Sequence, residues 1–255
     1  MFDYKIEDIV TTLMDVGVKS GDSVFVHSNL GFFGHLENCK TSDFLCESFI
    51  SAFFDILGEE GTLIVPTYSY SFCHNEVYDP ESTPTTCGLL SSYFLKNYNN
   101  NRSLDPNFSV CGKGRLIDYY INCNTHESFG KDCFWERFIE KEGKVVCLNF
   151  DSGSTMVHYI EKINNVDYRY NKSFNGVIKI GNREYKDYAV HFVYDNTRDA
   201  DAPFFNRLDE FCKKKQISHC KNLGNGTVLA FSSRDYVIRI SDLLKLRPRF
   251  LVKEE

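Results

Sequence analysis

The chain has 255 residues and a formal net charge of −6, and 42% of its residues are hydrophobic. This composition supports a large folded core and argues against disorder. The longest basic run, at residues 213–215, is too short to favour nucleic acid or an anionic membrane as a partner. No apolar stretch of about 18 residues is present to cross a membrane, and the N-terminal segment lacks the pattern of a signal peptide. The ten cysteines contain no CxxC pair, so we expect reduced thiols and a cytoplasmic location.

Hydrophobic periodicity predicts alternating helices and strands over the first 150 residues. Helices are expected at 6–16, 41–57, 89–98, 115–123 and 131–143, and short apolar strands at 23–30, 61–69, 107–114 and 144–150. Thr41, Ser42 and Asp43 are residue types that cap helix N-termini, and they mark the start of the second helix. The irregular stretch at about 69–88 is too long for an ordinary connection, so we expect it to have a functional role.

The pattern changes in the last third of the chain. Residues 154–163 are expected to form a helix, and residues 176–195 a β-hairpin with its turn at Gly181 and Asn182. A helix at 203–215, a strand at 226–233 and a final helix at 234–246 complete the prediction. We therefore expect one domain over residues 1–255. Its fold class is α/β, with a mixed, mostly parallel central sheet, flanking helices and an antiparallel addition in the C-terminal half.

Three of the predicted strands end in polar residues. These ends are residues 27–29, Pro66 with Thr67, and residues 149–155. In open α/β sheets, ligands bind beyond the carboxyl ends of the strands. We therefore expect the three groups to line one crevice.

The helix predicted after the third of these strands carries the strongest catalytic signal. Residues 152–155 can cap its N-terminus, where free backbone N–H groups can bind an anion or a developing oxyanion. His158 and Glu161 lie one turn apart on the same face of this helix. A carboxylate beside an imidazole fixes its tautomer and raises its basicity, which suits a general base.

Other interpretations of these residues stay open at this point. A His–Glu pair at this spacing is also an ordinary hydrogen bond of a helix. A metal site would need further ligands, and the other histidines, including His219 beside Cys220, show no metal-ligand spacing. A cysteine nucleophile would need a nearby histidine or helix start, and none of the ten cysteines is singled out in this way.

Six segments, taken in order, resemble the aminoglycoside 3-N-acetyltransferases, whose fold differs from that of the common GNAT acetyltransferases. The segments are GDSVFVHSNL (21–30), GEEGTLIVPTYS (58–69), YDPESTPTTCG (78–88), RSLDPNFSVCGKG (102–114), SFGKDCFWERF (128–138) and GKVVCLNFDSGSTMVHYIE (143–161). The likeness extends from about residue 6 to residue 250. The chain departs from the family pattern at Asn29, Cys87, Asp105 and Ser154, and residues 149–151 replace a glycine-rich stretch.

The resemblance implies acetyl transfer from acetyl-CoA, as co-substrate, to an amino group, without a metal. His158 would be the base that deprotonates the amine, Glu161 would orient it, and Thr155 would lie beside the reacting carbonyl. The residues that the resemblance assigns to CoA are His27, Ser28, Asn29, Leu30, Pro66, Thr67, Thr83, Ser109 and Val110. The expected partners are a small-molecule amine and, as an assembly left open, a second copy in a homodimer.

Two classes of acceptor are possible for the acetyl transfer that the resemblance implies. The acceptor is expected to contact Tyr68, Tyr70, Glu76, Asp151 and Arg169. A polycationic aminoglycoside would need a strongly acidic pocket, whereas this region is aromatic with few acids. A nucleotide-linked amino sugar for a surface glycan would instead use Arg169 and Lys172 for its phosphates, and this acceptor is favoured slightly.

Two functions of other classes also remain. One is a non-catalytic protein that binds CoA or a sugar, which the intact His158–Glu161 pair argues against. The other is a hydrolase with His158 as base, which the lack of a GxSxG segment weakens.

Overall fold

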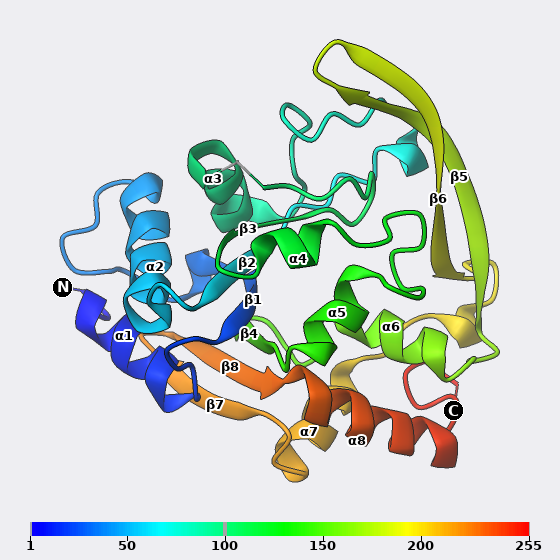
Figure 1. The fold of residues 1–255 in the computed structure, drawn as a ribbon. Coiled ribbons are helices and arrows are strands. Elements are labelled where there is room, and N and C mark those ends of the chain that lie inside the picture. The colour runs from blue at the N-terminus through cyan, green and yellow to red at the C-terminus, as the bar shows by residue number, and fades with distance from the viewer. Residues whose placement is uncertain (1, 99–100, 255) are drawn as a thin grey trace.

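The computed structural model describes residues 2–98 and 101–254, and within them a central sheet of six strands runs through the molecule (Figure 1). The strands are ordered β3-β2-β1-β4-β8-β7. Their bounds are β1 Ser23–Ser28, β2 Thr62–Pro66, β3 Val110–Gly114, β4 Lys144–Leu148, β7 His219–Leu223 and β8 Gly226–Ser232. β1 pairs in parallel with β2 and β4, while β3, β8 and β7 join in antiparallel orientation. The predicted α/β fold with a mixed sheet is confirmed, and its parallel part is the centre of the sheet.

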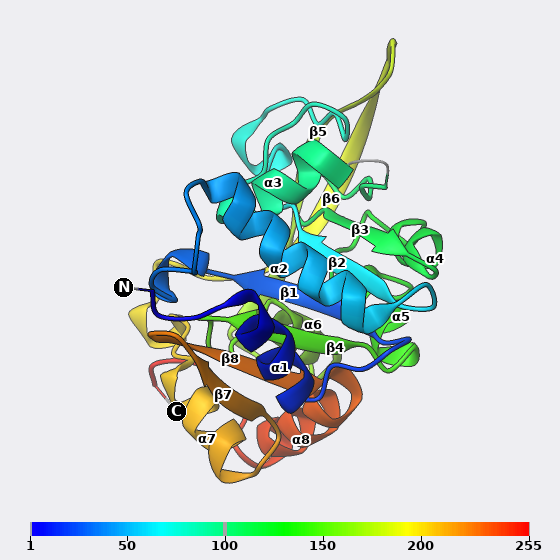
Figure 2. The same cartoon turned by 90° about the vertical axis from the view of Figure 1, so that its left-hand side faces the viewer.

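Helices cover both faces of the sheet because its central strands are apolar on both sides (Figures 1 and 2). On one face, Val24, Val26 and Leu63 pack in one cluster with the first three helices, α1 Ile6–Asp15, α2 Ser42–Leu57 and α3 Gly88–Tyr98. On the other, Phe25 and Val145 pack in a second cluster with the remaining helices, α4 Ile117–Ile121, α5 Phe134–Glu140, α6 Met156–Ile163, α7 Asn206–Lys214 and α8 Ser233–Leu246. Alternate residues of β1 thus belong to different cores.

A long hairpin projects from this body (Figure 2). It consists of β5 Arg169–Ile180 and β6 Arg183–Tyr194, with the turn at residues 181–182 as predicted. Its base begins at Arg169 rather than near 176, because residues 169–175 pair with residues 188–194 although they lack apolar alternation. The hairpin packs against the 69–88 stretch: Tyr78 N donates to Val177 O at 2.9 Å, and a Cβ added at Gly176 would lie 2.3 Å from the ring of Phe72.

The remaining differences are shifted element ends, one strand and three short turns that the sequence pattern does not predict. β2 ends at Pro66 and β3 begins at Val110, since beyond them Thr67 N donates to Ser109 O without regular pairing. β7 was not predicted, because most of its residues are exposed and polar at the edge of the sheet. Short 3-10 turns lie at Leu30–Phe32, Phe72–His74 and Asp199–Asp201. No helix of the described residues has the length and apolar character needed to span a membrane.

Candidate active site

The carboxyl ends of β2, β1 and β4 meet at one edge of the sheet, because these three strands are adjacent and parallel. Asn29 N donates to Leu148 O at 2.8 Å, and Asn149 Nδ2 donates to Asn29 O at 3.2 Å. The ends of β1 and β4 are therefore tied together by main-chain and amide hydrogen bonds.

His27, at the end of β1, lies buried beneath the start of α6. Its Nε2 is 3.0 Å from Ser154 Oγ and accepts from Thr155 N at 3.4 Å, while its ring stacks on Phe150. Burial lowers the pKa of His27 to about 4, so the imidazole is a neutral acceptor here. At the N-terminus of α6, Ser154 Oγ accepts a hydrogen bond from Met156 N. The side chain of Thr155 makes no capping hydrogen bond. His27 thus fixes the segment that leads into α6.

His158 and Glu161 form the expected pair on α6. His158 Nδ1 lies 2.7 Å from Glu161 Oε2, and the Glu161 side chain is fully buried while that of His158 is 22% exposed. The same Oε2 is 2.7 Å from Nε of Arg169, whose side chain is 5% exposed. An ionised carboxylate only accepts hydrogen bonds, so Nδ1 carries the proton and Nε2 keeps a free lone pair.

The charges around this pair set its protonation. Burial by itself raises the pKa of Glu161, but Arg169 and His158 outweigh it, and the pKa lies below its usual value. Burial, followed by the charge of Arg169, lowers the pKa of His158, and the bond to Glu161 opposes both. Near neutral pH the site therefore holds a carboxylate, a guanidinium and a neutral imidazole.

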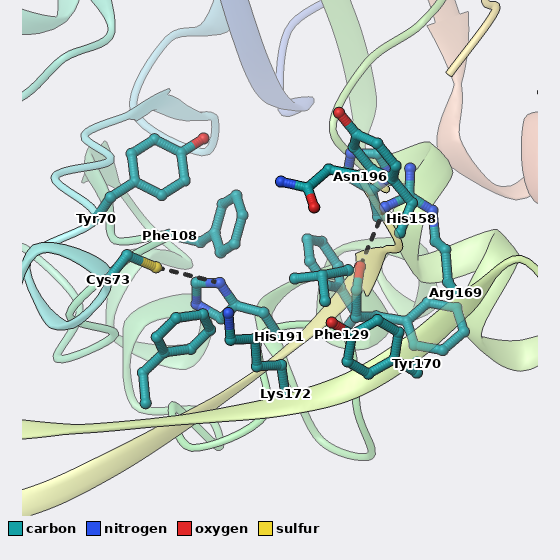
Figure 3. A pocket seen from close by; sticks show the side chains of 14 residues that line it. Tyr70, Cys73, Phe108, Phe129, His158, Arg169, Tyr170, Lys172, His191 and Asn196 are labelled. Atoms are coloured by element: carbon teal, nitrogen blue, oxygen red, sulfur yellow. Dashed lines mark hydrogen bonds between the residues drawn. The ribbon is translucent and has the colours of Figure 1, made fainter. Parts of the chain in front are cut away.

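His158 opens into a cavity of about 360 Å³ between α6, the 69–88 stretch and the base of the hairpin (Figure 3). Its walls are largely aromatic, with His158 and Arg169 on one side and Cys73 and His191 on the other. The lining residues are Tyr70, Cys73, Phe108, Phe129, His158, Arg169, Tyr170, Lys172, Phe174, His191, Phe192, Val193, Tyr194 and Asn196. Among the described residues that line it, none is Asp or Glu.

Several residues of the cavity wall are not marked by any pattern in the sequence. His191 belongs to no motif, yet its Nδ1 lies 3.7 Å from Cys73 Sγ in the cavity wall. Phe129 was only part of a motif, yet its ring lies edge-on to His158 at 5.6 Å. Their chemistry becomes visible only once the hairpin is placed in three dimensions.

Several residues assigned to CoA by resemblance are buried around Arg102, which the sequence did not single out. Arg102 donates to Thr67 O at 2.6 Å, to Thr83 O at 2.5 Å and to Ser109 Oγ at 3.1 Å. The side chains of Leu30 and Val110 are buried in the two cores, and Pro66 pairs with Val110 in the sheet. Arg102 therefore joins the 69–88 stretch to β2 and β3.

A second cavity, of about 520 Å³, lies at the carboxyl ends of β1 and β4. It is lined by Asn29, Asn149, Phe150 and Asp151, together with Asp209 and Lys213 of α7, and shares no lining residue with the first.

The residues predicted to contact the acceptor divide between these places. Tyr70 and Arg169 line the first cavity, whereas Asp151 lines the second. Tyr68 is buried behind the first cavity and interacts with the side chain of Thr155, and Glu76 is exposed and lines neither cavity.

Comparison with known proteins agrees with this geometry. The profile of the family described as aminoglycoside 3-N-acetyltransferase matches residues 25–245. The SPbeta prophage-derived aminoglycoside N(3')-acetyltransferase-like protein YokD of Bacillus subtilis is 26% identical over 212 residues, which cover 71% of this chain and 73% of that protein. Its crystal structure matches with a TM-score of 0.80 at 17% identity, covering 99% of this chain and 97% of that one.

Two solved complexes share the fold. One is AAC-IIIb with CoASH, with a TM-score of 0.79 and 15% identity, covering 98% of both chains. The other is a mutant of the aminoglycoside acetyltransferase AAC(3)-IVa in complex with a gentamicin, with a TM-score of 0.77 and 22% identity, covering 97% of this chain and 91% of that one.

The matched family profile defines the class of protein, an acetyl-CoA-dependent N-acetyltransferase with acetyl-CoA as its co-substrate. The chain belongs to the aminoglycoside 3-N-acetyltransferase family.

Proposed function

We propose that the protein acetylates an amino group of an amino sugar by direct attack on acetyl-CoA, with His158 as the general base. The observation that carries this proposal is the His158 Nδ1–Glu161 contact of 2.7 Å, which leaves Nε2 available to the cavity. A protonated amine has no lone pair for attack, so a neutral imidazole at this place supplies what the reaction needs.

The reaction then needs no covalent enzyme intermediate. The acceptor reacts as its free amine, after its ammonium proton has passed to solvent, and attacks the thioester carbonyl as His158 Nε2 takes the second proton from the nitrogen, so that a tetrahedral oxyanion forms. Collapse of this intermediate breaks the C–S bond, releases the CoA thiolate and leaves the acetamide. The imidazolium then returns the proton to the thiolate or to solvent. Thr155, at the N-terminus of α6 and in contact with Tyr68, is our candidate partner for the oxyanion.

We place the acceptor in the hairpin cavity, because the base must lie beside the attacking nitrogen. The walls described there carry Lys172 and Arg169 but no carboxylate, and Arg169 is already paired with Glu161. A polycation would meet no counter-charge there. A nucleotide-linked amino sugar, such as a precursor of a surface glycan, would find Lys172 for its phosphates and aromatic rings for its base.

An aminoglycoside is the competing acceptor, since gentamicin is bound by a related fold. The feature that favours it is the second cavity, where Asp151 supplies negative charge, although the charge of Asp209 there is balanced by Lys213 at 2.6 Å. In our assignment CoA instead approaches from the strand ends, where Asn29 lines that cavity. The buried Thr67 and Ser109, together with the half-buried Thr83, would then shape this edge from beneath.

The test is acetyl transfer itself. Purified protein is incubated with acetyl-CoA and a panel of aminoglycosides and nucleotide-linked amino sugars, and free CoA is measured by chromatography because the ten cysteines would react with a thiol reagent. We expect turnover with nucleotide-linked amino sugars and little with aminoglycosides. The reverse preference would overturn the acceptor assignment, and binding of acetyl-CoA without transfer to any amine would favour a binding protein. Light scattering in the same buffer decides between a monomer and the homodimer that the sequence leaves open, and cell fractionation tests the cytoplasmic location.

A further inference from the structure

The guanidinium of Arg169 is held inside the active site rather than offered to a ligand. Its Nε lies 2.7 Å from Glu161 Oε2, and its Nη1 donates to Phe192 O at 3.1 Å on the opposite strand of the hairpin. The group also lies over the ring of Tyr194, with 5.8 Å between Cζ and the centroid. Three contacts therefore fix one buried cation directly behind the His158–Glu161 pair.

The Glu161 carboxylate needs this cation. Its side chain has no exposed surface, and the described residues offer no hydrogen-bond partner to its Oε1. A buried carboxylate without a positive partner would either take up a proton or keep one on His158. In both cases Nε2 of His158 would no longer act as an effective proton acceptor near neutral pH.

We propose that Arg169 is a positioning residue of the acetyl-transfer site, which holds the Glu161 carboxylate against His158 Nδ1 and balances its charge so that His158 remains a neutral base. This inference rests on the proposed function for its catalytic consequence, although the charge balance itself can be measured without turnover. It assigns Arg169 a role distinct from binding the phosphates of an acceptor.

The other groups near His158 do not replace Arg169. The titratable and charged groups around the pair and its cavity are Glu161 on α6, Arg169, Tyr170 and Lys172 on β5, Tyr70 and Cys73 on the 69–88 stretch, His191 and Tyr194 on β6, and Tyr168, whose side chain interacts with Glu161. Burial lowers the pKa of His191 to about 4 and raises that of Tyr70 to about 12, so both are neutral near pH 7. Lys172 is exposed at the rim of the cavity, where solvent screens its charge. Arg169 is thus the buried cation in contact with the carboxylate.

The first experiment is an NMR titration of the histidine rings in the full chain, with the His158 signal assigned by its loss in His158→Ala. In Arg169→Gln we expect the pKa of His158 to rise by about one unit, a tenfold change in the protonation equilibrium. Arg169→Lys, which keeps the charge, should retain most of the lowered pKa. Arg183→Gln, at the exposed far end of the hairpin, is the matched control and should leave it unchanged. An unchanged His158 pKa in Arg169→Gln would overturn the proposal.

Activity provides a second readout with a different signature. In Arg169→Gln the acidic limb of kcat/KM should move to higher pH by the same amount, because the imidazole then loses its proton only at higher pH, and KM for acetyl-CoA should stay the same. A higher acceptor KM with an unmoved pH profile would instead indicate a substrate-binding arginine. If no acceptor is turned over at all, the proposed function fails while the NMR titration still decides the charge balance.

Arg169→Gln could also unfold the protein, since it leaves a buried carboxylate unpaired. The double variant Glu161→Gln with Arg169→Gln removes both charges and should then recover most of the lost Tm. Failure of this double variant to fold better than Arg169→Gln alone would contradict the proposed balance of charge.

Discussion

One histidine lies beneath the start of α6 and another lies on that helix, and their surroundings differ in two respects. His27 at the strand ends and His158 facing the hairpin are both kept neutral by burial. His27 has no carboxylate against its ring and accepts from the backbone of Thr155. His158 has Glu161 at Nδ1 and a cavity in front of it. The comparison teaches that burial alone makes a hydrogen-bond acceptor, whereas burial with an oriented carboxylate and open space makes a base.

Removing the base should have the largest effect. His158→Ala is expected to lower kcat by about 10²- to 10⁴-fold, because proton removal from the amine is lost, while acetyl-CoA still binds by calorimetry. The exposed His74→Asn serves as the control and should behave as wild type. Turnover close to wild type in His158→Ala would remove the distinction between the two histidines.

Neutralising the carboxylate should cost stability as well as rate. Glu161→Gln leaves Arg169 buried without its partner, so we expect a loss of about 3–5 kcal/mol in the free energy of unfolding. The pH profile of kcat/KM should also move, since the imidazole loses its charged neighbour. Denaturant unfolding and rate profiles measure the two effects, with the exposed Glu184→Gln as control. Full stability together with an unchanged profile would show that Glu161 does not act on His158.

Changing His27 should affect folding more than chemistry. His27→Leu removes the acceptor for Thr155 N and the partner of Ser154 Oγ, so we expect a loss of about 1–3 kcal/mol in the free energy of unfolding.

The pH dependence of stability sharpens this prediction. The folded pKa of about 4 is below the ordinary value of 6.5, so the unfolded chain binds a proton that the folded chain does not. Wild-type stability should therefore fall as the pH drops from about 6.5 toward 4, and His27→Leu should show a shallower slope. A slope identical to that of wild type would contradict the neutral state of His27.

The smallest effect is expected at the rim of the hairpin cavity. Lys172→Gln should raise KM for a phosphate-bearing acceptor roughly tenfold through the loss of one charge-assisted contact, with kcat nearly unchanged. Steady-state kinetics at low and high salt measure it, because screening should reduce the difference between the variants. Lys186→Gln, exposed farther along the hairpin, is the control. Equal KM values in wild type and Lys172→Gln would place the anionic group elsewhere.

The features that the sequence predicts correctly are those determined by hydrophobic periodicity and strand order. The helix containing His158 and Glu161 follows from apolar spacing after a buried strand, and the adjacency of strand ends follows from a parallel sheet. The contact of Arg169 with Glu161 does not follow, because β5 begins in polar residues that have no periodicity and are placed by tertiary packing. Arg102 was missed for the same reason, since its acceptors are carbonyl and hydroxyl oxygens of three separate segments.

Gly176 sets the distance between the hairpin and the body of the enzyme. A methyl group at this position would collide with the ring of Phe72, so the absence of a side chain sets how closely the hairpin approaches the body. Phe174 and Lys172, which line the cavity, lie two and four residues away on the same strand. A larger residue at 176 would therefore widen the space for the acceptor without altering any side chain that lines it. Mutation and selection could thus change the size of the molecule acetylated through a position that never touches that molecule.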